Sequence, residues 1–225
     1  MLLFQQESAV KELKKNIKLF NSKPIIYWTL KSLKESGIFD LIIVSSDSNK
    51  ILDISKKFNP NIKLIKRPKK LANDYALARD VIKHAILYLK DIIKIDIVCS
   101  VYPCNPFLNI EKIKESIILV KKKPSYMVHP IIAYDHPIER ALILKNKIIS
   151  PVFPEKIKKR TQDCIKTYHD IGQFYTAKKE TWLKIDPLQK RIGLENLSWE
   201  SVDIDHQDDW KKAEIFHKIL NHKKK

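Results

Sequence analysis

The sequence predicts one α/β domain, built on a mostly parallel β-sheet that carries helices on both faces. The first observation behind this prediction is that short runs rich in β-branched residues alternate with amphipathic segments of helical period along most of the chain. The second is the length, because 225 residues suit one such domain and can bury a substantial core. The third is that the best runs are continuously apolar, which is typical of strands covered on both sides.

The expected elements follow in chain order. A helix is expected from Pro24 to Gly37, where a proline stands near the start, apolar residues recur at helical spacing and a glycine follows. The run from Leu41 to Ser46 is predicted as a buried strand, and residues 95–103 as the central strand. Further helices are expected at residues 48–58, 75–90, 110–123, 178–185 and 206–222, and further strands at residues 62–68, 125–132, 168–177 and 199–205. From about Asp135 to Ile165 the alternation lapses, and we expect a hairpin with an irregular excursion.

The net charge of +17 limits the classes of partner. Such a charge can serve nucleic-acid binding, attract small anions or reflect a drift of composition toward lysine. We expect no nucleic-acid partner, because the basic residues are spread along the chain without interleaved aromatic residues. No apolar run approaches the ~18 residues that span a bilayer, so we expect no membrane partner and a cytoplasmic protein. The three cysteines have no spacing typical of a disulfide framework or a zinc site.

Asp203 and Asp205 form a pair of carboxylates at the end of the last predicted strand. Residues i and i+2 of a strand point to the same face, and two neighbouring carboxylates repel unless a cation lies near them. Mg²⁺ binds through one or two carboxylates and completes its shell with water and phosphate oxygens. The pair therefore predicts a Mg²⁺–nucleotide site, with a solvated acidic pair as the alternative. Asp208 and Asp209 are expected to stabilise the first turn of the following helix.

A second candidate site is the polar run from Tyr168 to Tyr175. Within it, His169, Asp170 and Gln173 could bind the hydroxyl or amide groups of a sugar. The alternative is a hydrogen-bonded network at a strand end that serves the fold alone.

Arginine is rare in this lysine-rich chain, which singles out Arg67, Arg140 and Arg160. The planar guanidinium binds carboxylates and phosphates through two parallel hydrogen bonds, which lysine cannot do. These three residues are therefore candidates for anion binding, with ordinary surface ion pairs as the alternative.

Eight segments, in this order along the chain, resemble the CMP-nonulosonate cytidylyltransferases, and most closely those that act on pseudaminic acid. The segments are KKNIKLFNSKPIIYW, IFDLIIVSSDS, RPKKLANDY, VIKHAILYLK, YPCNPFL, HPIERAL, RTQDCIKTYHDIGQFY and DIDHQDDWKKAE, which together cover most of the chain from Lys14 onward. The run from Arg160 to Tyr175 is the most specific, because the sialic acid enzymes differ there. The resemblance implies a Rossmann-like nucleotidyltransferase fold, a three-layer sandwich in a single domain over residues 1–225, with a small dimerisation excursion at about 135–165.

The activity that the resemblance implies is the transfer of CMP from CTP to a nine-carbon 2-keto sugar acid, with release of pyrophosphate, for a bacterial surface glycan or flagellin. Pseudaminic acid is the expected acceptor, and sialic or legionaminic acid are the alternatives. Mg²⁺ is the implied cofactor and a homodimer the implied assembly, in which each subunit lends residues to its partner's site. An inactive relative and a basic nucleic-acid-binding protein are the alternatives of another class.

The resemblance also implies roles for individual residues. Lys15 and Asn16 match the nucleotide-binding Lys-Asn pair, and Lys15 would act in catalysis together with Asp203 and Asp205, which would hold the metal. Arg67 and Asp74 match the nucleotide side. The residues implied to bind the acceptor are Tyr102, Arg140, Arg160, His169, Asp170, Gln173 and Tyr175. The segment after Tyr102 departs from the family, because Cys104 and Asn105 stand where Thr-Ala or Thr-Ser is usual.

The family's glycine-rich loop, close to IIPARGGSKRIPKKN, is replaced here by LLFQQESAVKELKKN, which itself predicts a helix start. Glu7 would bring negative charge to where phosphates lie, a repulsion of about 1–4 kcal/mol at contact distance. The codons permitted for Leu2 to Leu13, read one base earlier, allow Ile-Ile-Pro-Ala-Arg-Val-Gly-Gly-Lys-Arg-Ile. A frameshift that ends in the lysine codons at Lys14 and Lys15 would explain the difference, and an evolved loss of the loop is the alternative.

Overall fold

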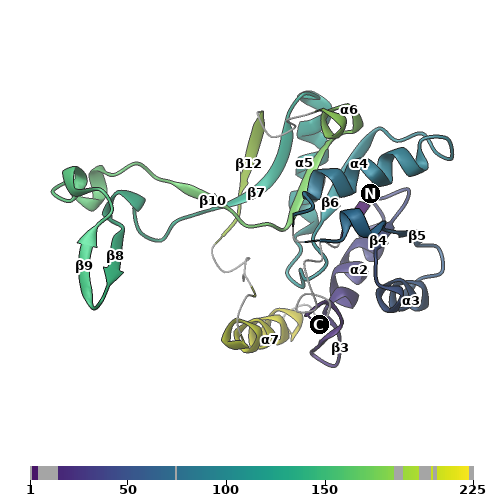
Figure 1. Ribbon diagram of the computed structural model, residues 1–225, viewed down its shortest axis with the longest axis horizontal. Coiled ribbons are helices and arrows are strands. Elements are labelled where there is room, and N and C mark those ends of the chain that lie inside the picture. The colour runs from purple at the N-terminus through teal and green to yellow at the C-terminus, as the bar shows by residue number, and fades with distance from the viewer. Residues whose placement is uncertain are drawn as a thin grey trace.

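The computed structural model describes residues 2–4, 15–73, 75–184, 190–197, 204 and 207–222. Its main sheet has the strand order β10-β7-β11-β6-β1-β4-β5, and β12 also pairs with β7. Of these eight strands only β10 and β11 run against the others, so the predicted mostly parallel sheet is confirmed (Figure 1). The strands are β1 (Leu2–Phe4), β4 (Ile43–Ser46), β5 (Lys63–Lys66), β6 (Ile97–Val101), β7 (Met127–Ala133), β10 (Tyr168–Asp170), β11 (Phe174–Lys178) and β12 (Arg191–Glu195).

Helices cover both faces of this sheet, which confirms the three predicted layers. The helices are α2 (Ile25–Glu35), α3 (Asn49–Phe58), α4 (Ala78–Leu89), α5 (Ile110–Lys122), α6 (Lys179–Leu183) and α7 (Gln207–His222). Val44 and Cys99 pack into a core with α2, α3 and α5, whereas their neighbours Ile43 and Val98 pack into a second core with α4 and α6. Successive strand residues point to opposite faces, so one sheet supports both cores.

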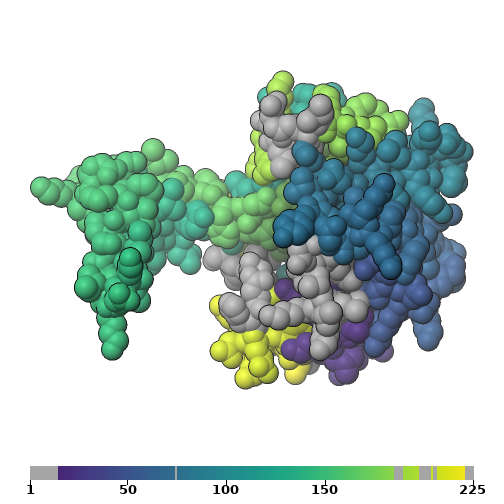
Figure 2. Space-filling view, viewed as in Figure 1, coloured from purple at the N-terminus to yellow at the C-terminus, as the bar shows by residue number. Residues whose placement is uncertain are grey.

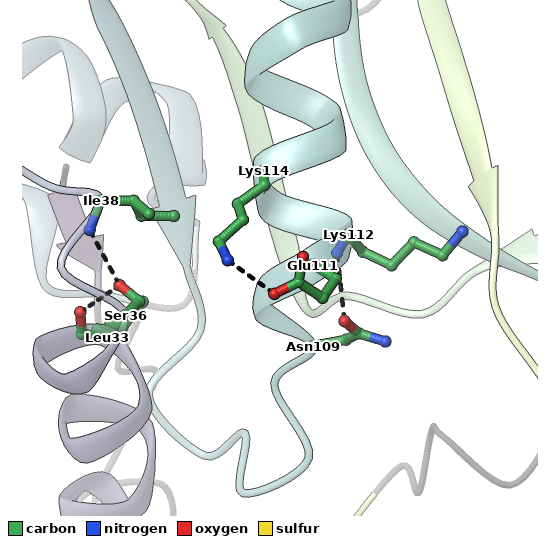
Figure 3. Close-up of polar contacts among 7 residues, drawn as sticks. All are labelled: Leu33, Ser36, Ile38, Asn109, Glu111, Lys112 and Lys114. Carbon is green, nitrogen blue, oxygen red and sulfur yellow. Dashed lines mark hydrogen bonds and ion pairs between the residues drawn. The ribbon is translucent and has the colours of Figure 1, made fainter.

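Local side-chain contacts and a glycine mark the start of α5 and the end of α2. The side chain of Asn109 caps α5 and accepts a hydrogen bond from the backbone N–H of Lys112 at 3.2 Å (Figure 3). The α2 helix ends at Glu35, and the hydroxyl of its C-cap residue, Ser36, donates to the carbonyl of Leu33 at 2.6 Å. Gly37 follows with φ of +63°, the left-handed conformation that commonly terminates a helix.

Between β7 and β10 the chain leaves the sheet and forms an excursion, residues 134–167, which stands away from the sheet in Figures 1 and 2. A hairpin of β8 (Leu142–Lys145) and β9 (Ile148–Pro151) lies where the sequence predicts one. Asn146 and Lys147, at its turn, both have positive φ, as a tight two-residue hairpin turn requires. Three short 3-10 turns complete the excursion, at Ile138–Arg140, Pro154–Lys156 and Thr161–Asp163.

The structure differs from the sequence-based expectation after the excursion. Residues 168–177, expected as one strand, form β10 and β11 on opposite sides of β7, and Gly172 between them has φ of +60°. The strand β12 was not expected, because charged ends and a glycine obscure its pattern. Packing explains the glycine at position 193, since a Cβ there would lie 2.4 Å from the side chain of Ile131. Of the strand expected at 199–205, only Ile204 belongs to the described residues.

A third, smaller core joins α7 to the first part of the chain. It contains Phe20 of the hairpin formed by β2 (Leu19–Phe20) and β3 (Lys23–Pro24), together with Ile204, Trp210 and Ala213. Phe20 and Trp210 meet edge to face with ring centroids 5.6 Å apart. Asp208 and Asp209 occupy the first turn of α7, as predicted. Among the described residues, no helix has the length and apolar character needed to cross a bilayer.

Candidate functional site

Arg67 lies buried just after β5, with 2% of its surface exposed. Its guanidinium NH2 donates to the carbonyl of Ser45 at 2.7 Å, and its backbone N–H donates to Ser46 at 2.9 Å. The guanidinium is therefore fixed at the carboxyl end of β4, where ligands of such sheets bind. The alternative of an ordinary surface ion pair is wrong for this arginine.

The surroundings of Arg67 are electropositive. Burial lowers the pKa of His84 on α4, and the positive charges of Lys70 and Arg67 lower it further. Sequence reasoning missed Lys70 and His84, because lysine is abundant in this chain and His84 lies within a regular helical pattern. A field of this sign suits a triphosphate.

Lys15 and Asn16 lie in a helical turn just before the β2–β3 hairpin. Asn16 is 3% exposed, and its side-chain oxygen accepts a hydrogen bond from the thiol of Cys104 at 2.7 Å. Cys104 belongs to the turn after β6, so this contact joins the predicted nucleotide side to the predicted acceptor side. The thiol supplies a hydrogen-bond donor here, as the threonine implied by the resemblance would.

The turn after β6 is held by a buried threonine that sequence reasoning did not single out. The hydroxyl of Thr29, on α2, donates to the carbonyl of Pro103 at 2.6 Å and accepts from the backbone N–H of Asn105 at 3.1 Å. The side-chain amide of Asn105 lies 3.5 Å from the carbonyl oxygen of Gln173, to which the backbone N–H of Tyr102 donates at 3.1 Å. The segment after β6 and the segment before β11 therefore form one wall at this edge of the sheet.

Asp170 is the centre of a polar cluster on this wall. Its Oδ1 accepts from the backbone N–H of Gly172 at 2.9 Å, and its Oδ2 accepts from the hydroxyl of Tyr175 at 2.8 Å. His129 Nδ1 and Arg191 NH1 lie 3.5 Å and 3.7 Å from the same Oδ2. Burial raises the pKa of Asp170, but His129 and the Gly172 N–H outweigh it, so the pKa lies below its ordinary value and the carboxylate stays charged.

Tyr175 complements this carboxylate. Burial raises the pKa of its hydroxyl well above the ordinary value, and the charge of Asp170 raises it further, so Tyr175 remains a donor at any physiological pH. Its ring meets that of Tyr102 edge to face at 6.2 Å and stacks on the imidazole of His129 at 5.4 Å. The cluster thus combines one fixed carboxylate with several donors and aromatic faces, an arrangement that suits a polyhydroxylated or acylated sugar.

Arg140 and Arg160 lie apart from this cluster, and His169 meets it at the backbone, where its Nδ1 lies 3.2 Å from the carbonyl oxygen of Asp170. The side chain of His169 is exposed and contacts the ring of Tyr134, with centroids 4.8 Å apart. Arg140 and Arg160 belong to the excursion, where Arg140 donates to the carbonyl of Lys159 at 3.1 Å and Arg160 pairs with Asp163 at 2.8 Å. Their role in acceptor binding stays a prediction.

Asp74, Asp203 and Asp205 lie outside the described residues, so the predicted metal pair and one nucleotide residue stay predictions. Within the part of the chain that the structure describes, no group of three or more His, Cys, Asp or Glu side chains could hold a metal ion. Ile204, which separates the two predicted metal ligands in sequence, is buried at 4% exposure in the core of α7.

A family model described as cytidylyltransferase matches residues 13–182, which is most of the chain and includes the Arg67, Cys104 and Asp170 surroundings. The chain belongs to the cytidylyltransferase family. The predicted enzyme class, a nucleotidyltransferase, is thereby confirmed.

Curated relatives of this cytidylyltransferase extend over nearly its whole length. The pseudaminic acid cytidylyltransferase of Campylobacter jejuni subsp. jejuni serotype O:2 is 32% identical over 93% of this chain and 91% of its own. A Helicobacter pylori protein named pseudaminic acid cytidylyltransferase and UDP-2,4-diacetamido-2,4,6-trideoxy-beta-L-altropyranose hydrolase is 30% identical over 88% of this chain and 39% of its own. The N-acylneuraminate cytidylyltransferase of Escherichia coli O18:K1:H7 is 25% identical over 93% of this chain and 50% of its own.

Solved structures agree on the fold of the cytidylyltransferase. The CMP:2-keto-3-deoxy-manno-octonic acid synthetase complexed with CTP superposes with a TM-score of 0.68 over 97% of this chain and 98% of its own, at 11% identity. A 4-diphosphocytidyl-2C-methyl-D-erythritol synthase gives a TM-score of 0.66 over 96% of both chains, at 10% identity. At such low identity these structures support the predicted Rossmann-like α/β architecture and nothing finer.

Proposed function

We propose that this cytidylyltransferase is a cytoplasmic enzyme that transfers CMP from CTP to pseudaminic acid and releases pyrophosphate. The observation that carries the proposal is the identity of 32% to a pseudaminic acid cytidylyltransferase over 93% of the chain, against 25% over the same share for an N-acylneuraminate enzyme. The Asp170–Tyr175 cluster supports it, because it lies within the most specific segment of the resemblance and offers the donors and the acceptor that a sugar needs.

The proposed reaction forms one bond and breaks one. The anomeric hydroxyl oxygen of the acid attacks the α-phosphorus of CTP, the bond from that phosphorus to the bridging oxygen breaks, and pyrophosphate leaves while the hydroxyl proton passes to solvent. Such reactions are accelerated chiefly by positioning and charge neutralisation. Lys15 and Arg67 would bind the triphosphate on the electropositive side of the site, and the Asp170 cluster would orient the acid.

Mg²⁺ fits the proposal through the chemistry of Asp203 and Asp205, since carboxylates are the ligands that this ion prefers. Ile204, which stands between the two in sequence, is itself buried in the small core that contains Trp210 and Phe20. When bound, the ion would neutralise charge on the phosphates.

The decisive experiment measures pyrophosphate release from CTP and Mg²⁺ with pseudaminate, legionaminate or sialate as acceptor. Two chains are compared: the chain as it stands, and a version in which the glycine-rich loop replaces residues 2–13. We expect release with pseudaminate to exceed release with the other acids at least ~10-fold in the loop-restored chain, and to be slower in the chain as it stands, because the loop binds phosphates through backbone N–H groups. Equal or higher rates with sialate would refute the acceptor, and no release by either chain would refute the activity.

We also propose that the excursion joins two copies of the chain. Its hairpin exposes apolar side chains on both strands, with 69% of Leu144, 73% of Ile148 and 64% of Ile149 accessible. An apolar surface of this kind on a projecting hairpin is typical of an interface rather than of a monomer. Arg140 and Arg160, which one subunit holds away from its own Asp170 cluster, would then be available to the other subunit.

Light scattering coupled to size exclusion tests the assembly. Ile148→Lys is expected to convert a dimer into a monomer, because it places a charge in an apolar interface. The matched control is Ile215→Lys, which changes a side chain of similar exposure, 60%, on the outer face of α7. A parent chain that is monomeric at 100 μM, or a control that dissociates as readily as the variant, would refute the interface.

A further inference from the structure

His129 is a buried histidine whose Nδ1 has only a long contact, to Asp170, among the residues that the structure describes. It lies on β7, opposite Gly193 of β12, and is 5% exposed. Within the described part of the chain, its Nδ1 has no partner at normal hydrogen-bond length, since Asp170 Oδ2 is 3.5 Å away, longer than a normal N–H···O bond. A buried polar atom of this kind costs free energy unless a ligand or water satisfies it.

Arg191 faces the same oxygen of Asp170 as His129 does, at a similar distance. Its NH1 is 3.7 Å from Asp170 Oδ2, also beyond hydrogen-bond length, and about a third of its side chain is accessible. Asp170 already receives two short hydrogen bonds, from Tyr175 at 2.8 Å and from Gly172 at 2.9 Å. The Asp170 carboxylate therefore attracts both His129 and Arg191 without forming a short hydrogen bond to either.

The position of these two donors connects them with the acceptor. The His129 ring stacks on Tyr175, and Tyr175 contacts Tyr102, which follows β6 at the carboxyl edge of the sheet. His129, Arg191 and Asp170 therefore line the same wall as the residues expected to bind the sugar acid. A ligand atom placed between the two donors must accept hydrogen bonds, since a guanidinium has no acceptor.

We propose that His129 and Arg191 form a subsite for an acceptor oxygen that carries no proton, either a carboxylate oxygen or the carbonyl oxygen of an acyl-amino group. The inference rests on the proposed function, because it assigns this subsite to the sugar acid. It makes the two residues determinants of which acid binds: an acid that presents a hydroxyl here offers a poorer acceptor and leaves the buried His129 nitrogen less well satisfied. Selection of this kind by buried polar groups is strong, because the wrong ligand leaves them unpaired.

The test is equilibrium binding of pseudaminate by calorimetry, with and without CDP and Mg²⁺, so that it does not depend on turnover. Two variants of His129 separate its donor from its ring. His129→Asn keeps an N–H close to the Nδ1 position and loses the stack, whereas His129→Phe keeps a ring on Tyr175 and loses the donor. We expect the phenylalanine variant to bind about 10- to 100-fold more weakly and the asparagine variant to stay within about threefold of the parent.

Arg191→Leu is expected to weaken binding by a similar factor, and Arg79→Leu serves as its control for the loss of one positive charge, since Arg79 lies on α4 and pairs with Asp80. Two further ligands distinguish the possible oxygens. If the carboxylate is the group bound, reduction of C1 to the alcohol removes the effect of the variants. If an acyl-amino carbonyl is bound, an acid without acyl groups on its nitrogens removes it.

The outcomes separate this inference from the proposed function. Weaker binding by His129→Phe and Arg191→Leu, with Arg79→Leu unchanged, supports the subsite. If pseudaminate binding is unchanged in His129→Phe and lost in His129→Asn, His129 serves the fold through its ring. That result would overturn the inference while the proposed function stands. A parent chain that releases pyrophosphate with another acid, yet binds no pseudaminate, would overturn the proposed acceptor together with the inference.

Discussion

Replacing Ile204 tests whether the small core around α7 anchors the segment that carries the predicted metal ligands. Ile204 is 4% exposed and packs with Phe20, Ile25, Trp210 and Ala213. Valine removes one methylene and should lower the free energy of unfolding by about 1 kcal/mol. Alanine removes three carbons, which at about 0.8 kcal/mol each gives about 2.4 kcal/mol for transfer alone. The cavity raises the expected cost of alanine to about 3–4 kcal/mol.

Urea denaturation followed by tryptophan fluorescence measures the stability of these variants, because Trp28 and Trp210 both contact the core that contains Ile204. The midpoint should fall from parent to valine to alanine while the slope stays constant, since the surface exposed on unfolding hardly changes. In the loop-restored chain, Ile204→Ala should also weaken Mg²⁺ binding, because Asp203 and Asp205 flank the anchor in sequence.

The control for this series is Ile215→Ala on the exposed face of α7, where 60% of the residue is accessible. That change should alter stability by less than about 0.5 kcal/mol. The reasoning is refuted if Ile204→Ala costs less than about 1 kcal/mol, or if the Ile215 control costs as much as the buried position.

Three further predictions concern groups elsewhere in the chain. Burial raises the pKa of Cys99 to about 11, so iodoacetamide at pH 8 should label Cys104 and Cys164 in the native protein and reach Cys99 only in urea, as mass spectrometry can verify. The pKa of the Asp170 carboxyl is depressed in the folded protein. The stability that this carboxylate contributes is therefore present above the unfolded-state pKa of about 3.9 and is lost as the pH falls through the folded-state pKa. The destabilisation caused by Asp170→Asn should accordingly shrink below about pH 4 and stay constant above it. Resequencing the gene should give bases before the Lys14 codon that encode the glycine-rich loop in another frame, and bases that cannot do so would exclude the frameshift.

The sequence predicts the layered core well, because that core depends on local periodicity. The helices at 25–35 and 110–122 lie within a residue or two of their predicted ranges, and the strand at 97–101 is central, since a buried apolar run has few alternatives. The paired strands after the excursion were harder to predict. The division of residues 168–177 depends on Gly172 and on pairing with a strand distant in sequence, which a local pattern does not contain.

Some residues of the candidate site could be predicted from the sequence and others could not. Asp170, Tyr175 and Arg67 could be singled out as candidates because polar or rare residues at predicted strand ends are conspicuous in sequence. His129 was not singled out because it lies inside a strand whose pattern is otherwise apolar, and its contact with Asp170 depends on the pairing of β10 with β7. Arg191 was missed although the rarity of arginine, applied to every arginine of the chain, would have included it. The burial of Arg67 likewise depends on the register of β4 with β5.

The excursion leaves the sheet at Ala133 and returns at Tyr168, and these two residues are direct partners in the β7–β10 ladder. The next pair outward is also joined, since the N–H of Tyr134 donates to the carbonyl of Thr167 at 3.0 Å. A segment inserted between two hydrogen-bonded neighbours can lengthen, shorten or be exchanged without shifting any strand of the sheet. Changes in the excursion, residues 134–167, can therefore alter the proposed contact between subunits while the strands that carry Asp170 and Tyr175 keep their register.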